Sequence, residues 1–199
     1  MDYGNPTVTR FRREKVYYYK KQQNKKLVIF MGIDMVIQHD SFQERHDYDL
    51  PTLGKYLSEK YNNPIYEQMD EYDVGATYYD WNMPCIGFFR ELSRIFNAGI
   101  VVHAGLTRYN SLENIKALFG LYDMSEYIIA TVGSKTISKV DGIKNFLTEN
   151  TEIDDYLVID FDPNVIKEFP GHAIKIDCMM SGKEFNIAYN YFMKYLRRK

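Results

Sequence analysis

Short apolar runs alternate with amphipathic segments along most of the chain, and the two patterns predict different elements. Five runs rich in β-branched residues have the length of buried strands, at residues 27–31, 99–103, 127–131, 156–160 and 173–176. Apolar residues recur at helical spacing at residues 86–96 and in segments that begin near Ser111, Ser138 and Ser181. This alternation predicts an α/β fold, a Rossmann-like three-layer sandwich around a mainly parallel sheet.

Two parts of the chain depart from this alternation. Residues 38–80 are polar and rich in Tyr and acidic residues, with one expected helix at about 52–61, so we interpret them as an insertion after the first strand. Residues 1–26 are expected to form a basic arm with a candidate edge strand around 8–19. The expected organisation is therefore an arm followed by a single domain over residues 27–199.

Composition narrows the class of protein. The chain has 199 residues, of which 45% are hydrophobic, so we expect a sizeable core and not wholesale disorder. The longest apolar runs have about five residues, whereas a membrane helix needs about 20, so no membrane association is expected. The two cysteines, Cys85 and Cys178, are too few for a disulfide scaffold and favour a reduced, cytoplasmic setting.

Charge is unevenly distributed. Residues 1–26 carry eight Lys/Arg and two acidic residues, and residues 194–199 carry four more Lys/Arg. The remainder has 25 acidic residues against 13 Lys/Arg. A basic arm on an acidic body fits contact with nucleic acid or an acidic partner, but a solvated terminal arm explains the same charges and is the simpler interpretation.

Polar residues and glycines follow the ends of the predicted strands. In a parallel sheet these carboxyl ends meet at one edge, where ligands bind. The candidate site residues selected in this way are Gly32, Asp34, His103, Ala104, Lys135, Lys139, Asp160 and Asp162.

Four of these segments resemble the haloacid dehalogenase-like phosphohydrolase superfamily. Residues 29–37 align without a gap to the family's first motif, an apolar strand followed by Asp-x-Asp-Gly-Val-Leu or a close variant. His103 falls at the family's Ser or Thr, and Lys139 matches its Lys or Arg near a helix start, with Lys135 as a second candidate. Residues 160–162 match the final acidic cluster. The resemblance covers about residues 26–196, with gaps in the insertion, and is greatest to small members with minimal caps.

The resemblance implies a chemistry that this chain retains only in part. In the family the first Asp of motif one is the nucleophile, the second is a general acid and base, and the final acids help to hold Mg²⁺. By this match Asp34 is the acid, Lys139 neutralises phosphate, and Asp34, Asp160 and Asp162 are the Mg²⁺ ligands. Gly32 stands at the nucleophile position, so no aspartyl-phosphate can form there and Mg²⁺ loses a charged ligand.

Several residues keep more than one interpretation. A shifted alignment makes Asp34 the nucleophile but leaves Val36 as the acid, and Asp34 alone also suits an Asx turn. His103 fits a phosphate donor or a substitute nucleophile, although a His satisfied by a backbone hydrogen bond is commoner. Asp162 fits a metal ligand or, equally, the cap of a short helix at 164–168.

The expected function is that of a catalytically degenerate haloacid dehalogenase-like protein, a pseudoenzyme. It would bind a phosphorylated small molecule, a nucleotide, a nucleic-acid end or a partner at the strand ends, with Gly32, Ala104 and Lys135 as ligand contacts and with weakened Mg²⁺ affinity. Two alternatives remain open: an active Mg²⁺-dependent phosphatase or nucleotidase that uses Asp34 or a non-standard nucleophile, and an interaction protein that retains only the fold. Whether the chain is an enzyme is left undecided at this stage.

Overall fold

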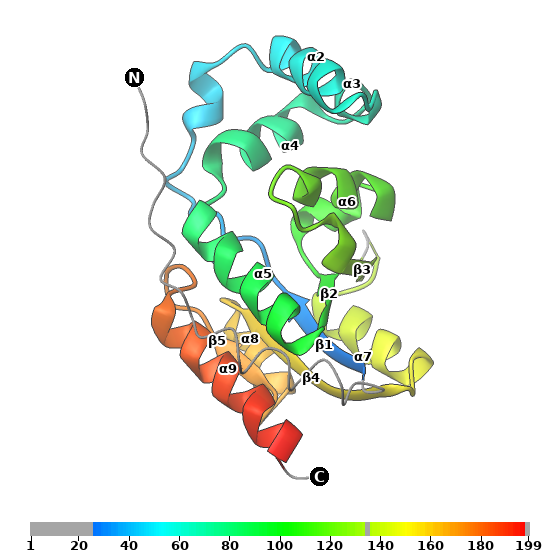
Figure 1. Cartoon of the computed structure of the whole chain (residues 1–199), viewed down its shortest axis with the longest axis vertical. Helices are drawn as coiled ribbons and strands as arrows, with labels where there is room; N and C mark the ends of the chain where they lie inside the picture. Colours follow the sequence, from blue (N-terminus) through cyan, green and yellow to red (C-terminus); the bar gives the residue numbers. More distant parts are fainter. Residues whose placement is uncertain (1–25, 134–135, 198–199) are drawn as a thin grey trace.

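Five parallel strands form one sheet at the centre of the computed structural model, which describes residues 26–133 and 136–197 (Figure 1). The strands are β1 (Lys26–Met31), β2 (Gly99–Val102), β3 (Ile128–Thr131), β4 (Ile153–Asp160) and β5 (Ala173–Lys175). Their order is β3-β2-β1-β4-β5, and each neighbouring pair is parallel. The predicted α/β fold with a parallel sheet is therefore confirmed, with β1 between β2 and β4.

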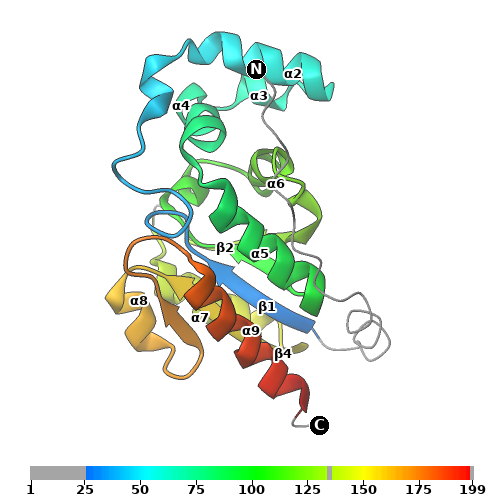
Figure 2. The same cartoon turned by 60° about the vertical axis from the view of Figure 1, so that its left-hand side comes forward.

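Helices cover both faces of the sheet. Side chains alternate along a strand, so Ile29 and Met31 face one layer while Val28 and Phe30 face the other. The first layer contains α5 (Met83–Phe96), α6 (Leu112–Gly120) and α9 (Gly182–Arg197), and Figure 2 shows α5 and α9 side by side in front of β1. The second contains α7 (Lys139–Glu149) and α8 (Pro163–Glu168). This is the predicted three-layer sandwich.

Capping side chains define where the helices begin. Ser111 accepts a hydrogen bond from Asn114 N at the start of α6. Ser181 N donates to the Glu184 carboxylate (3.1 Å), as in a capping box, at the start of α9. In the segment between β1 and α5, the predicted helix at 52–61 begins two residues earlier, at Leu50, because Asp49 caps it.

Residues 38–80, which we call the helical insert, lie between β1 and α5. They form a 3₁₀ turn η1 (Glu44–Asp47), helices α2 (Leu50–Tyr61), α3 (Ile65–Gln68) and α4 (Glu71–Gly75), and a π-helical turn η2 (Ala76–Asp80). Figures 1 and 2 both show α2, α3 and α4 together at one end of the molecule, beyond α6. The hydroxyl of Tyr66 on α3 donates to the Ala117 carbonyl on α6 (2.9 Å), which ties the insert to the core.

Residues 1–25 of the expected basic arm, with its candidate edge strand, lie outside the described residues, and Lys26 belongs to β1. Within residues 26–133 and 136–197, no helix combines the length and the apolar character needed to cross a membrane.

Two further 3₁₀ turns, η3 (Gly105–Arg108) and η4 (Ser125–Tyr127), connect the strands on the β2–β3 side of the sheet.

Candidate functional site

Three of the candidate residues stand level with one another at the carboxyl ends of the central strands. The last residues of β1 and β2 pair with each other, and Met31 also pairs with Ile159 on β4. The next residues along each strand are Gly32, His103 and Asp160. Backbone hydrogen bonds continue the ladder to this level, from Gly32 N to the Ile159 carbonyl (2.9 Å) and from His103 N to the Met31 carbonyl (3.0 Å).

The same three positions face the same layer of the sandwich. The side chains two residues earlier, which all belong to the cluster packed against α7 and α8, are Phe30, Val101 and Val158. Because side chains alternate along a strand, His103 and Asp160 also project toward the α7 side. Strand register and alternation together therefore produce the cluster that the sequence had only placed at one edge.

The start of α7 brings a cation to this cluster. Ser138 caps the helix by accepting a hydrogen bond from Asp141 N (3.1 Å), so α7 begins at Lys139. A Cβ atom at Gly142 would lie only 2.7 Å from Gly133 N, so the missing side chain lets α7 pack closely on the loop that follows β3. This close approach holds Lys139 at the edge of the sheet.

Asp160 is enclosed, and both of its carboxylate oxygens are engaged. Its side chain is 0% exposed. Oδ1 accepts a hydrogen bond from Asp162 N (2.7 Å), and Oδ2 accepts one from Lys139 Nζ (3.1 Å). The Lys139 side chain is 20% exposed, and its ammonium lies 5.4 Å from the centroid of the Phe161 ring. Asp160 is therefore the anionic partner of Lys139, whereas the sequence had suggested it as a metal ligand.

His103 lies behind Asp160 and is completely buried. Its Nδ1 is 3.3 Å from Asp160 Oδ2, and the Phe30 backbone lies close enough to favour the protonated ring, although neither ring nitrogen makes a hydrogen bond of ordinary geometry among the described residues. Burial, together with the positive charge of Lys139, lowers the pKa of His103 to about 3. The imidazole is therefore neutral at pH 7. It has no exposed surface from which to contact a ligand in this conformation, so its assignment as a phosphate donor stays a prediction.

The carboxylate of Asp160 fills the space that a side chain at Gly32 would occupy. A Cβ atom at this position would lie 2.9 Å from Asp160 Oδ2 and 3.2 Å from Asp160 Cγ. Real Cβ atoms do not approach other heavy atoms so closely, so any side chain at position 32 would displace the Asp160 carboxylate. Gly32 thus permits the enclosed position of Asp160.

Asp34 occupies a tight turn just after β1. The Ile33 carbonyl accepts hydrogen bonds from Val36 N and Ile37 N (both 3.0 Å), and Met35 adopts a left-handed conformation with φ of 58°. Asp34 remains exposed at the surface of this turn. Burial of part of its carboxyl group raises its pKa, while the positive charge of Lys139 opposes the rise.

Ala104 and Asp162 serve local structure. The Ala104 carbonyl accepts a hydrogen bond from the Thr107 hydroxyl (2.8 Å), which is also 3.2 Å from the Val132 carbonyl. Thr107, which the sequence reasoning did not select, thereby joins the ends of β2 and β3. Asp162 Oδ1 accepts from Asn164 N (2.8 Å), which is the predicted helix cap at the start of α8. Lys135 lies outside the described residues.

The arrangement of these donors does not fit Mg²⁺. Position 32 contributes no side-chain oxygen, and both oxygens of Asp160 already accept hydrogen bonds. The ammonium of Lys139 takes the place where a cation would approach Oδ2. In the part of the chain that the structure describes, no group of three or more His, Cys, Asp or Glu side chains could hold a metal ion. We therefore derive no step through a metal, and the Mg²⁺ assignment stays a prediction.

The position of Lys139 at a helix start favours a paired or anion-binding role, but sequence reasoning did not name Asp160 as its partner or the ring of Phe161 beside it. The available signals were the lysine at the first position of a helix, where a cation is unfavourable, and the aromatic residue between two acids. Among the described residues, and with His103 neutral, the site contains the carboxyl groups of Asp34, Asp160 and Asp162 and the ammonium of Lys139. An external anion can reach the ammonium of Lys139 only in competition with Asp160.

No protein-family model matches this chain, and no curated protein matches it in sequence. Its function is therefore argued from the fold and from the geometry of the site.

Proposed function

We propose that the chain is a non-hydrolysing relative of the haloacid dehalogenase-like phosphohydrolases that binds a phosphate-bearing ligand at the carboxyl edge of the sheet. Two features support the proposal. The segments that resemble the family's motifs end β1, β2 and β4 and begin α7, and they meet at one edge. In open parallel sheets this edge is where ligands bind.

The observation that carries the non-hydrolysing part is the contact between Gly32 and Asp160. Hydrolysis through a phospho-aspartate needs a carboxylate on the end of β1. Here that position has no side chain, and the carboxylate of Asp160 lies where its Cβ would stand. His103 is no substitute nucleophile in this conformation because it is completely buried. At the nucleophile position of the family the site therefore offers no attacking group.

The ligand-binding part depends on Lys139. Its ammonium has three N–H donors, of which Asp160 accepts one, and its side chain keeps 20% of its surface exposed. A phosphate oxygen can accept a remaining donor. The carboxylates of Asp160 and Asp34 oppose an anion, so affinity is weak at pH 7. Protonation of Asp34, whose pKa is raised by burial, removes one of these two opposing charges.

Two-dimensional amide NMR of the full chain tests the proposal with inorganic phosphate and with phenyl phosphate, in EDTA and in Mg²⁺. In EDTA we expect either phosphate compound to change the chemical shifts of the Gly32 and Ala104 amides. Asp160→Asn keeps the shape and removes the competing charge, so it should tighten phosphate binding about tenfold or more. Lys175→Met, at a lysine paired with Asp177 on the surface, is the matched control and should leave binding unchanged.

Three outcomes would overturn the proposal. Phosphate that binds only with Mg²⁺, and that Asp160→Asn releases, would make Asp160 a metal ligand. Turnover of phenyl phosphate at about 1–1000 s⁻¹, lost in Asp34→Asn, would make the chain an active phosphatase. No shifts under any condition would favour an interaction protein that retains only the fold.

A further inference from the structure

Exposed aromatic side chains gather on the helical insert. Among the described residues, eleven large apolar side chains are exposed, and six of them lie between residues 42 and 78. These six are Phe42, Tyr48, Tyr56, Tyr61, Tyr72 and Tyr78. Single exposed apolar residues are ordinary on protein surfaces, but a concentration on one small element is typical of an interaction surface.

The tyrosine rings of the insert contact one another. Tyr48 and Tyr79 stack with ring centroids 4.0 Å apart and planes 4° apart, and Tyr78 meets Tyr79 edge-on at 5.0 Å. On α2, the ammonium of Lys60 lies 5.4 Å from the Tyr56 ring and 5.3 Å from the Tyr61 ring. Helix α4 packs against both α2 and η2, so the two groups lie on neighbouring elements of the insert. We call these five residues the tyrosine surface, namely Tyr48, Tyr56, Tyr61, Tyr78 and Tyr79.

The insert that carries the tyrosine surface is strongly acidic. Residues 38–80 contain ten Asp or Glu and three Lys or Arg. Arg45 and Asp80 form an ion pair in which the Asp80 side chain is 0% exposed, so their charges cancel inside the insert. The exposed acids that remain are Asp40, Glu44, Asp47, Asp49, Glu59, Glu67, Asp70 and Glu71. This excess of negative charge repels the phosphates of nucleic acid and attracts cations.

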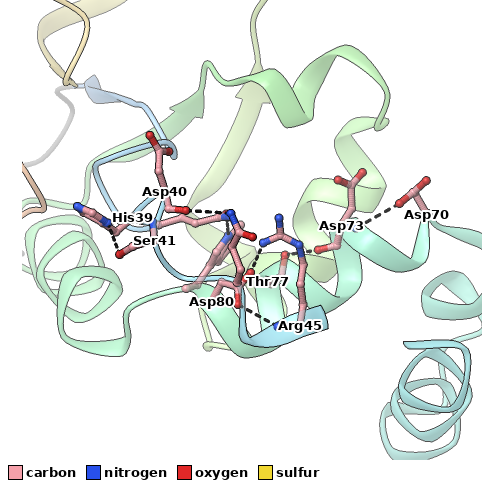
Figure 3. A network of polar contacts seen from close by, with 11 residues as sticks. His39, Asp40, Ser41, Arg45, Asp70, Asp73, Thr77 and Asp80 are labelled. Atoms are coloured by element: carbon pink, nitrogen blue, oxygen red, sulfur yellow. Dashed lines mark hydrogen bonds and ion pairs between the residues drawn. The ribbon is translucent and has the colours of Figure 1, made fainter. Parts of the chain in front are cut away.

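Buried polar contacts hold the insert in one shape. Figure 3 shows Arg45 reaching Asp80, and Asp73 beside Thr77, whose hydroxyl donates to the Asp73 carbonyl (2.9 Å). Asp73 Oδ2 also accepts a hydrogen bond from Asn110 Nδ2 of the core (2.7 Å). A surface that is already ordered loses little conformational entropy when a partner binds.

We propose that the tyrosine surface binds an arginine-rich segment of a separate polypeptide. A guanidinium stacks on tyrosine rings and pairs with carboxylates, so it matches both the aromatic and the acidic character of this surface. The chain already shows the underlying contact, because Lys60 places its own cation over two of the rings. The proposal concerns the insert alone and does not depend on the phosphate site.

Fluorescence anisotropy with the full chain tests this at an ionic strength of about 0.15 M. The probes are fluorescein-labelled peptides of alternating Gly and Arg, Gly and Lys, and Gly and Glu. We expect the Arg peptide to bind, the Lys peptide to bind about threefold more weakly, and the Glu peptide not to bind. Tyr56→Ser/Tyr78→Ser should weaken binding of the Arg peptide about fivefold or more. Tyr109→Ser, at an exposed tyrosine outside the helical insert, is the matched control.

The comparison of variants separates stacking from general attraction to an acidic protein. Both tyrosine variants are first shown by thermal unfolding to retain the wild-type fold. Equal affinity for Arg and Lys peptides, or an unchanged affinity in Tyr56→Ser/Tyr78→Ser, would overturn the proposal. Binding that appears only after the Arg and Lys residues of segment 1–26 are replaced by Gln would also overturn it, because the chain's own arm would then be the occupant.

Discussion

Lys139→Met tests the central contact of the candidate site most directly. The substitution leaves the Asp160 carboxylate, whose side chain is 0% exposed, with the amide of Asp162 as its remaining hydrogen-bond donor among the described residues. His103 does not replace the lost charge, because burial, the larger cause of its lowered pKa, remains when Lys139 is removed. Removing one partner of a buried ion pair costs about 3–5 kcal/mol, because the other charge stays buried.

The partial exposure of Lys139, 20% of its side chain, places the expected loss near the lower end, at about 3 kcal/mol. For a chain of this size each kcal/mol corresponds to about 2–4 °C, so the midpoint of thermal unfolding should fall by about 6–12 °C. The double variant Lys139→Met/Asp160→Asn removes the stranded charge as well. It should recover about 2 kcal/mol relative to Lys139→Met, since the two sites are coupled.

Urea unfolding at pH 7 of the wild type, the two single variants and the double variant measures this coupling. Lys175→Met is the control, because its pair with Asp177 is exposed at both side chains (53% and 78%) and should contribute little to stability. A Lys139→Met protein as stable as the Lys175→Met control would refute the reasoning. So would a double variant no more stable than Lys139→Met.

Three further substitutions test individual contacts. His103→Gln should flatten the acid limb of the stability profile. The pKa of His103 is about 3 in the folded chain and about 6.5 when unfolded. Above about pH 6.5 the residue is neutral in both states, so stability is not reduced by its titration. Stability is lost by up to about 1.4 kcal/mol per pH unit as the pH falls toward 3, and parallel urea-derived profiles for both proteins would contradict this assignment. Gly32→Asp places a Cβ 2.9 Å from Asp160 Oδ2, so calorimetry in EDTA should show a loss of about 1–3 kcal/mol. Mg²⁺ should restore part of it by screening the two carboxylates, and a midpoint insensitive to Mg²⁺ would mean that the carboxylates do not meet. Asp80→Asn leaves Arg45, whose side chain is 19% exposed, without its anion, and should cost about 2–4 kcal/mol in urea unfolding. An unchanged urea midpoint would show that this ion pair does not stabilise the insert.

The periodicity of the sequence was sufficient to predict the class of fold. A run such as residues 27–31 contains no polar position, so both of its faces must be buried, which is the condition of a strand in a covered parallel sheet. Helix starts were equally readable, because Ser138 and the Ser181–Glu184 capping box act within one turn of chain. The cap at Asp162 belongs to the same class of local signal.

The sequence by itself thus determined which segments are buried and where the helices begin, because burial and capping are encoded over a few neighbouring residues. It also placed the candidate residues at strand ends. Only the tertiary structure decided that Asp160 pairs with Lys139, that His103 is buried beside Asp160, and that tyrosines of the insert meet on its surface. Those contacts depend on strand register and on how closely helices pack, and both are set by residues far apart in the chain.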